Sequence, residues 1–337
     1  MTAMDSVEEM DKGHAIEIEF DPMLSEEVVL YEINKREQMG DGGALEDYHE
    51  RVDPLYGLPS RQKLKRIKDI HTEFFVDFGF EGIFKEILTE FPLIQDKVRK
   101  IYVIRAIKEE VADLTTDDES QNEELAEQPN TILVKLSSES FSNVEHLGMV
   151  MKHELMHVQD MLDEEFGYKP FLPSLSPLER TLVTDKYRVI WDIYIDTRLL
   201  RDGKKTVSNK DTYYREFKAT YLNIPQLERA QVFEGLWAME TITHDEIVEL
   251  AKDANKLLIR FTDRKEKIFL PGTPCPLCKF PTYHWMDSIG ERVDEKVIKG
   301  IQRDFPDWNP SNGACERCIE VYQAHASLSL QNTVHKK

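Results

Sequence analysis

A short apolar stretch in the middle of the chain, MVMKHELMHVQDML (residues 149–162), carries groups suited to zinc chemistry. His153 and His157 are four residues apart, and Glu154 directly follows the first histidine. On a helix this spacing puts both imidazoles on one side, within reach of one zinc ion. A carboxylate beside the metal can hold a water molecule and take its proton. The pattern therefore predicts a metal site in which Glu154 is the general base.

The position of Glu154 on the expected helix supports this interpretation. When residues 144–164 are placed on a helical wheel, Glu154 falls in the middle of the apolar face, among Leu147, Val150, Met151, Val158, Met161 and Leu162. A buried carboxylate without a partner costs several kcal/mol, so Glu154 needs one. The alternative is a pair of surface histidines, with Glu154 bound to a distant lysine or arginine.

The HELMH motif, preceded by the apolar strand-like stretch TILVKLSS (131–138), resembles the zincin metallopeptidases over roughly residues 65–205. The resemblance implies an α+β fold in which a small sheet lies beside the active-site helices. In zincins the strand before the motif is the sheet edge along which an extended peptide lies. The resemblance therefore implies a peptide or protein substrate.

A catalytic zinc usually has three protein ligands and a water molecule, so one ligand remains to be found. In RVIWDIYIDTRLL (188–200), Asp192 and Asp196 share a helical face with Val189 and Leu199. Glutamate-zincins carry a Glu ligand on their second helix, and an Asp four residues later bonds to a zinc histidine. The resemblance thus implies Asp192 as the third ligand and Asp196 as the orienting carboxylate.

The chain departs from the glutamate-zincins because Asp192 is one methylene shorter than Glu, so the two helices must approach more closely. Asp196 and Glu179 are alternative ligands. Both aspartates can also pair with arginines of the same helix, namely Arg188, Arg198 and Arg201. His146 is expected at the start of the motif helix. The sequence does not choose among the side chains that could stabilise an oxyanion, namely Tyr187, Tyr194, Tyr213, Tyr214 and His244.

All four cysteines lie near the C-terminus in two pairs, CPLC and CERC: Cys275, Cys278, Cys315 and Cys318. Two such pairs are typical of a closed Cys₄ zinc site, and this segment resembles a zinc ribbon over residues 270–325. ERVDEKVIKGIQRDF (291–305) is expected to form a helical insertion between them. We predict a structural zinc here, with partner binding or redox chemistry as alternatives. The chain would then hold two zinc ions, one catalytic and one structural.

The elements that position these groups follow from local patterns. We predict an acidic N-terminal arm (1–59), a zincin-like domain (60–265), a zinc-ribbon module (270–325) and a loose tail (326–337). Within them we expect a helix from 60 to 80 capped by Ser60, strands at 100–107 and 131–138, and an acidic loop at 117–130. The expected later helices are 178–200 and further segments between 211 and 262.

Composition limits the function classes. The net charge of −20 disfavours binding to nucleic acid or to anionic membranes. The basic run in 61–68 (Arg61, Lys63, Lys65, Arg66, Lys68) is interpreted as a solvated helix face. The N-terminal stretch does not look like a secretory signal, and no apolar run is long enough to cross a membrane. Together with the cysteine pattern, these features predict a cytoplasmic protein.

The sequence therefore favours a zinc-dependent metallopeptidase that uses Glu154 as its base. One alternative is a catalytically inactive, zincin-fold interaction protein that zinc stabilises and whose ribbon binds a protein partner. In that protein Glu154 would be dispensable. Another is a zinc hydrolase that acts on a non-peptide amide, because the motif alone does not select peptides.

Overall fold

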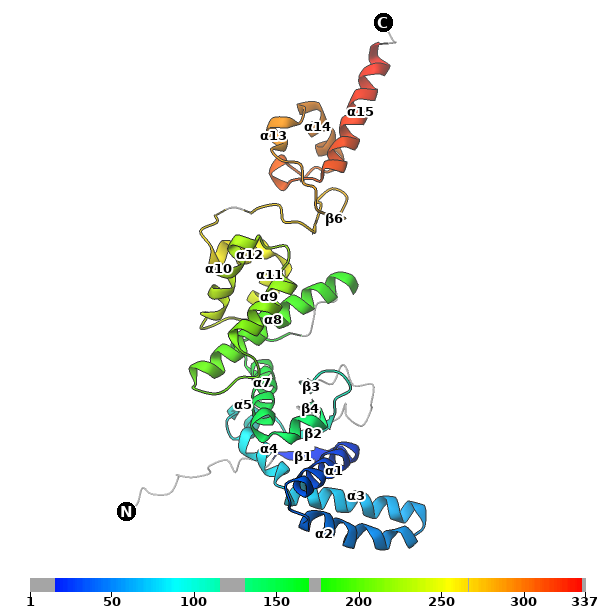
Figure 1. Cartoon of the computed structure of the whole chain (residues 1–337). Coiled ribbons are helices and arrows are strands. Elements are labelled where there is room, and N and C mark those ends of the chain that lie inside the picture. The colour runs from blue at the N-terminus through cyan, green and yellow to red at the C-terminus, as the bar shows by residue number, and fades with distance from the viewer. Residues whose placement is uncertain (1–15, 116–130, 170–176, 266, 335–337) are drawn as a thin grey trace, which may run out of the picture. The chain divides into compact units, whose positions relative to one another are not determined.

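The computed structural model describes residues 16–115, 131–169, 177–265 and 267–334 (Figure 1). This part of the chain is a mixed α+β protein that is mostly helical and contains a small sheet. It divides into two compact units. Unit 1 comprises Met1–Ser176, Trp191–Thr212 and Met239–Ile247, and unit 2 comprises Pro177–Ile190, Tyr213–Ala238 and Val248–Lys337.

Unit 1 contains the sheet and most of the helices up to the HELMH motif. Its elements are β1 (Glu17–Phe20), α1 (Pro22–Gln38), α2 (Gly43–Val52), η1 (Asp53–Gly57), α3 (Ser60–Asp77), α4 (Phe80–Leu88), α5 (Pro92–Lys97), β2 (Lys100–Arg105), β3 (Val111–Thr115), β4 (Thr131–Leu136), η2 (Ser138–Ser142) and α7 (Val144–Leu162). Helix α8 (Pro177–Arg201) contributes its residues from Trp191 onward to unit 1. No described helix is both long and apolar enough to cross a membrane.

Unit 2 contains a helical group and the cysteine segment. Its elements, some of which begin in unit 1, are α9 (Lys210–Thr220), α10 (Gln226–Trp237), α11 (His244–Lys252), α12 (Ala254–Phe261), β5 (Thr273–Pro274), β6 (Pro281–Thr282), α13 (Ile289–Arg292), α14 (Glu295–Asp304), η3 (Pro310–Asn312) and α15 (Glu316–Val334). The expected insertion at 291–305 is therefore helical. The loose tail expected after residue 325 is wrong up to Val334, because α15 continues to that residue.

The four-stranded sheet has the order β1-β2-β4-β3. Strands β1, β2 and β4 are parallel, with Ile101 opposite Ile132, whereas β3 runs antiparallel to β4. The expectation that the strand at 131–138 forms the sheet edge is wrong, because β4 lies between β2 and β3. Burial of both faces explains its nearly continuous apolar sequence. The edge next to α7 is β3, a five-residue strand that local patterns did not reveal.

Residues 16–52, within the predicted acidic N-terminal arm (1–59), form regular structure. They form β1, α1 and α2, and apolar residues of α1, including Leu24, Val28 and Val29, are buried in the core of unit 1. Asp21 caps α1 by accepting a hydrogen bond from the Leu24 N–H. Acidic residues of α1 such as Glu26 and Glu37 are exposed on its outer side, where charge is compatible with folding.

The two helices that carry the motif residues agree with the expected ranges. Asn143 caps α7 by accepting hydrogen bonds from the N–H groups of Glu145 and His146, and Lys97 donates to the carbonyl of Leu162 at the other end.

The helix expected from Ser60 is confirmed as α3, but its cap is not: Pro59 occupies the N-cap position and no side chain caps the helix. The fixed φ of proline selects this start instead.

Glu90, in the turn between α4 and α5, links α7 to the segment that follows α8. One carboxylate oxygen lies 2.7 Å from Lys152 Nζ, and the other lies 2.6 Å from Lys204 Nζ. Burial alone would raise the pKa of Glu90, but the two lysines outweigh burial and lower it. Because Lys152 precedes His153 on α7, this ion-pair network helps to hold the two ligand-bearing helices together.

We predict that Glu90→Gln lowers the free energy of unfolding by about 1 kcal/mol at neutral pH. A carboxylate with a lowered pKa stabilises the fold above its unfolded-state pKa of about 4.3 and loses that effect as the pH falls through its folded-state value. The difference between parent and variant should therefore shrink in acid. Denaturant unfolding at several pH values measures it, with Glu86→Gln, an exposed site on α4, as control. A difference that does not change with pH would contradict the ion-pair explanation.

Candidate metal centres

The structure brings His153, His157 and Asp192 together at the interface of α7 and α8. Their ligand atoms all lie within 4.8 Å of one another. The two Nε2 atoms are 3.3 Å apart, and Asp192 Oδ1 lies 3.1 Å from His157 Nε2 and 3.7 Å from His153 Nε2. Tetrahedral zinc with bonds of 2.0–2.1 Å requires ligand atoms about 3.3–3.4 Å apart. The three residues therefore fit a single zinc ion.

Asp196 orients His153 from the opposite side of the ring. Its carboxylate is fully buried and lies 2.7 Å from His153 Nδ1, and its other oxygen accepts a longer bond from the Ser208 N–H. Because Nδ1 faces a carboxylate, it carries the proton and leaves Nε2 for a metal. Burial alone would lower the pKa of His153, but Asp192 and Asp196 raise it to about 10. Two carboxylates thus hold a buried imidazole.

The partner of Glu154 is a backbone group of the sheet edge. Its carboxylate accepts a hydrogen bond of 2.9 Å from the N–H of Ala112 on β3. Burial raises the pKa of Glu154, and the neighbouring His157 and His153 act in the opposite direction. The carboxylate therefore lies between the metal ligands and the edge strand, which accounts for an acidic residue on an apolar helix face.

Sequence reasoning missed a second buried network behind His157. Asp160, one turn further along α7, accepts hydrogen bonds from Trp191 Nε1 (2.7 Å) and from the guanidinium of Arg198 (2.6 Å). The Trp191 ring in turn packs perpendicular to the imidazole of His157, with centroids 4.4 Å apart. Asp160 is an acidic residue only three positions after His157, which could have drawn attention to it. Its partners are more than thirty residues away in the sequence, so local spacing does not reveal them.

The sequence left open whether the aspartates of α8 pair with arginines, and whether Glu179 is a ligand. Arg198 pairs with Asp160 and Arg201 donates to the Met239 carbonyl, while Asp192 and Asp196 face the histidines. The side chain of Glu179 lies outside the described residues. His146 is half-buried in the first turn of α7, about two turns before His153.

The five candidate oxyanion donors are divided between the two units. Tyr187, Tyr213 and Tyr214 belong to unit 2, and the ring of Tyr194 packs under the guanidinium of Arg198. His244 belongs to unit 1 and contacts the rings of Phe166 and Tyr168, which both stack on Trp191. Burial lowers the pKa of His244, so its ring is neutral at physiological pH. His244 is therefore connected to His157 through Trp191 and a second ring, that of Phe166 or Tyr168.

The four cysteines also converge, within unit 2. Cys275 Sγ lies 4.0 Å from Cys318 Sγ, and Cys278 Sγ lies 3.9 Å from Cys315 Sγ. Four thiolates around zinc, with bonds of 2.3 Å, require sulfur atoms about 3.8 Å apart. The cluster thus fits one zinc ion. It sits on its own small core, which includes Leu277, Ile301 and Ile319.

The first cysteine loop is shaped to present backbone donors to a thiolate. Burial alone would raise the pKa of Cys275, but backbone N–H groups of Cys278, Cys315 and Leu277 lower it to about 7. Lys279 adopts a left-handed conformation (φ 64°) directly after the loop, which returns the chain toward Cys275. A lowered thiol pKa favours metal binding near neutral pH.

No protein-family model, curated protein or solved structure matches the chain.

We predict that Asp196→Asn lowers the zinc affinity of the His153–His157–Asp192 centre by about 10–100-fold, because an amide no longer holds the protonated Nδ1 of His153 with a negative charge. Competition with a chromophoric chelator measures the affinity. Asp185→Asn, at an exposed position of the same helix, is the control. Equal affinities for all three proteins would remove the orienting role of Asp196.

We predict that Cys278→Ser lowers the zinc content from two ions per chain to one and reduces thermal stability, because a structural zinc contributes directly to folding. Metal analysis and thermal unfolding of the purified full chain measure both effects. The His153→Ala variant should also lose one ion, but it should keep the cysteine centre. Unchanged zinc content and stability in Cys278→Ser would contradict the structural role.

Proposed function

We propose that this chain is a zinc-dependent hydrolase, and specifically a metallopeptidase of the zincin type with Asp192 as third ligand. The observation that carries the proposal is the convergence of the His153 and His157 Nε2 atoms with an Asp192 oxygen, directly beside Glu154. A purely structural site needs no base, whereas hydrolysis does. Three protein ligands also leave room for a water molecule in a tetrahedral site.

When bound, a zinc ion supplies a Lewis acid that polarises the carbonyl of the substrate and makes water more acidic. The chain's own residues have separate roles around it. Glu154 receives the proton of the attacking water on its carboxylate and delivers it to the leaving amine. Asp196 keeps His153 in one tautomer, and the N–H of Ala112 keeps the Glu154 carboxylate in place.

A peptide substrate is favoured over other amides by the edge strand. In the described sheet β3 is an outer strand, and the N–H of its residue Ala112 already reaches Glu154. An extended peptide can add to such an edge as a further strand, and backbone hydrogen bonds then align it. A peptide bound along β3 would lie close to Glu154. A small amide has no use for such a strand edge.

We predict that Glu154→Gln keeps its zinc but loses about 10²–10⁴-fold in rate, because Gln has the size of Glu and cannot accept a proton. Substrates come first from an unbiased peptide library, and cleavage is followed by mass spectrometry. Asp192→Ala should instead lose zinc from this centre. Glu145→Gln, on the exposed first turn of the same helix, is the control.

Cleavage of a library peptide by Glu154→Gln at the parent rate would refute the mechanism. If the zinc-loaded parent cleaves no library peptide but hydrolyses simple amides, the enzyme class holds and the peptide assignment fails. If zinc-loaded parent protein hydrolyses neither, the centre serves a non-catalytic interaction protein instead.

A further inference from the structure

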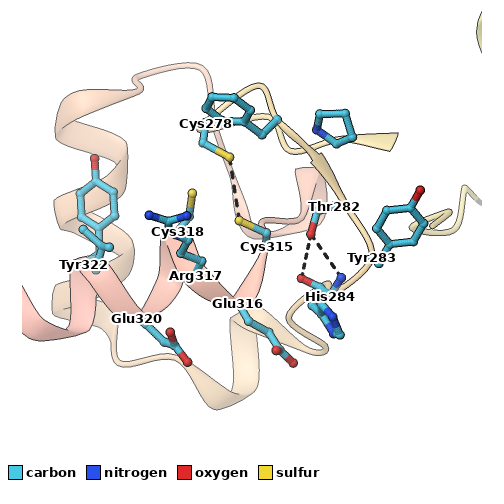
Figure 2. Close-up of a pocket in the computed structure, with 13 residues that line it drawn as sticks. Cys278, Thr282, Tyr283, His284, Cys315, Glu316, Arg317, Cys318, Glu320 and Tyr322 are labelled. Atoms are coloured by element: carbon cyan, nitrogen blue, oxygen red, sulfur yellow. Dashed lines mark hydrogen bonds between the residues drawn. The ribbon is translucent and has the colours of Figure 1, made fainter. Parts of the chain in front are cut away.

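A pocket of about 790 Å³ adjoins the cysteine cluster within unit 2 (Figure 2). One wall is the segment 280–284, which follows the first cysteine pair, and the other is the segment 315–322, which contains the second pair and the first turns of α15. Tyr283 and Tyr322 lie at opposite ends of the pocket in Figure 2. Its size suits several amino-acid side chains.

The pocket exposes apolar side chains that the ribbon's small core leaves uncovered. Phe280 is 73% exposed, Tyr283 is 72% exposed and Val321 is 46% exposed. Single exposed apolar residues are common, but two aromatic rings and a valine around one pocket form a patch. Such a patch is typical of surfaces that bind a partner, because covering it removes apolar area from water.

The charges in the pocket favour a cationic partner. Glu316 and Glu320 are exposed on the first turns of α15, and Arg317 is the only lysine or arginine among the residues that line the pocket. Cys278 and Cys318 line the pocket and are only partly buried. Four thiolates around a divalent zinc would add two negative charges close by. A basic side chain would also be attracted to the faces of Phe280 and Tyr283.

The walls are held in place before any partner arrives. Thr282 Oγ1 donates to the His284 carbonyl and accepts from the His284 N–H, which fixes one wall. The other wall is tied to α14, since Tyr322 donates a hydrogen bond of 2.9 Å to Asp304. The Glu316 N–H donates to the His284 carbonyl and joins the two walls. A preformed pocket lowers the entropy cost of binding.

We propose that this pocket is a docking site for an extended peptide segment in which basic and apolar side chains alternate. The basic side chains would face Glu316 and Glu320, and the apolar ones would cover Phe280, Tyr283 and Val321. Alternation suits an extended chain, because successive side chains point to opposite sides. This inference does not depend on the hydrolase proposal, and it would hold for a protein without catalytic activity.

The test uses the full-length, zinc-loaded protein with Glu154→Gln, so that a peptide probe is not cleaved. The probe is a short fluorescein-labelled peptide with a Lys-Leu-Arg-Leu core flanked by Gly and Ser. Matched probes have Glu-Leu-Glu-Leu and Lys-Ser-Arg-Ser cores. Fluorescence polarisation should show binding of the first probe, no binding of the acidic probe, and weaker binding of the serine probe.

Variants then locate the binding site. Glu316→Lys with Glu320→Lys should weaken binding of the basic–apolar probe about tenfold or more, because attraction becomes repulsion. Phe280→Ser with Tyr283→Ser should weaken it by a similar factor through lost apolar contact. Glu291→Lys with Glu295→Lys, exposed residues that do not line the pocket, changes the net charge equally and should leave binding unchanged. Zinc content is measured for each protein to show that the cysteine centre is intact.

Three outcomes would overturn the proposal. The first is binding of the acidic probe with the affinity of the basic one. The second is an equal loss of binding in the Glu291/Glu295 and Glu316/Glu320 variants, which would reveal attraction to overall charge. The third is self-association of the parent that the Phe280/Tyr283 variant abolishes, which would assign the pocket to a second copy of the chain.

Discussion

Charged side chains can be buried between α7 and α8 only if each has a partner, and this requirement determines how the two helices face each other. His153 lies between Asp192 and Asp196, while Asp160 binds Trp191 and Arg198 one turn beyond His157. A rotation of either helix would leave carboxylates in an apolar interface without partners. The same contacts bring the ligand atoms to separations that suit zinc, so stability and metal geometry share one cause.

The sheet supplies a partner for Glu154, the remaining carboxylate of the site. Because β3 lies at the edge beside α7, the Ala112 N–H can bind the carboxylate of Glu154, which also lies near His153 and His157. Glu90 acts further out, where its two lysines connect α7 with the chain after α8. Glu154 is thus held by a neutral donor, and the helices are held by ion pairs away from the candidate ligand atoms. Neither contact involves the atoms of His153, His157 and Asp192 that could bind a metal, so those atoms stay available for it.

Most of the candidate ligands, and the helices that carry His153, His157 and Asp192, could be predicted from local patterns in the sequence. His153 and His157 were predicted from helical spacing, Asp192 from the resemblance to the glutamate-zincins, and the four cysteines from their paired motifs. Long-range partners could not be predicted in this way. Trp191 pairs with Asp160, and β1 pairs with β2, because the fold brings them together and not because of a local repeat in the sequence. The short strands Glu17–Phe20 and Val111–Thr115 contain acidic residues and therefore did not look like strands. Acidic composition likewise concealed the buried face of α1.

The two candidate centres differ in a way that bears on their roles. Four cysteines complete a tetrahedral zinc site, so that centre has no position for water or substrate, whereas two histidines and one aspartate leave a position open. In the second centre Glu154 directly follows one of the candidate ligands, and it is held against β3 by the Ala112 N–H. The partly exposed thiolates of Cys278 and Cys318 would therefore contribute charge to their pocket rather than reactivity. Chemistry would then belong to the histidine centre, and recognition to the cysteine centre.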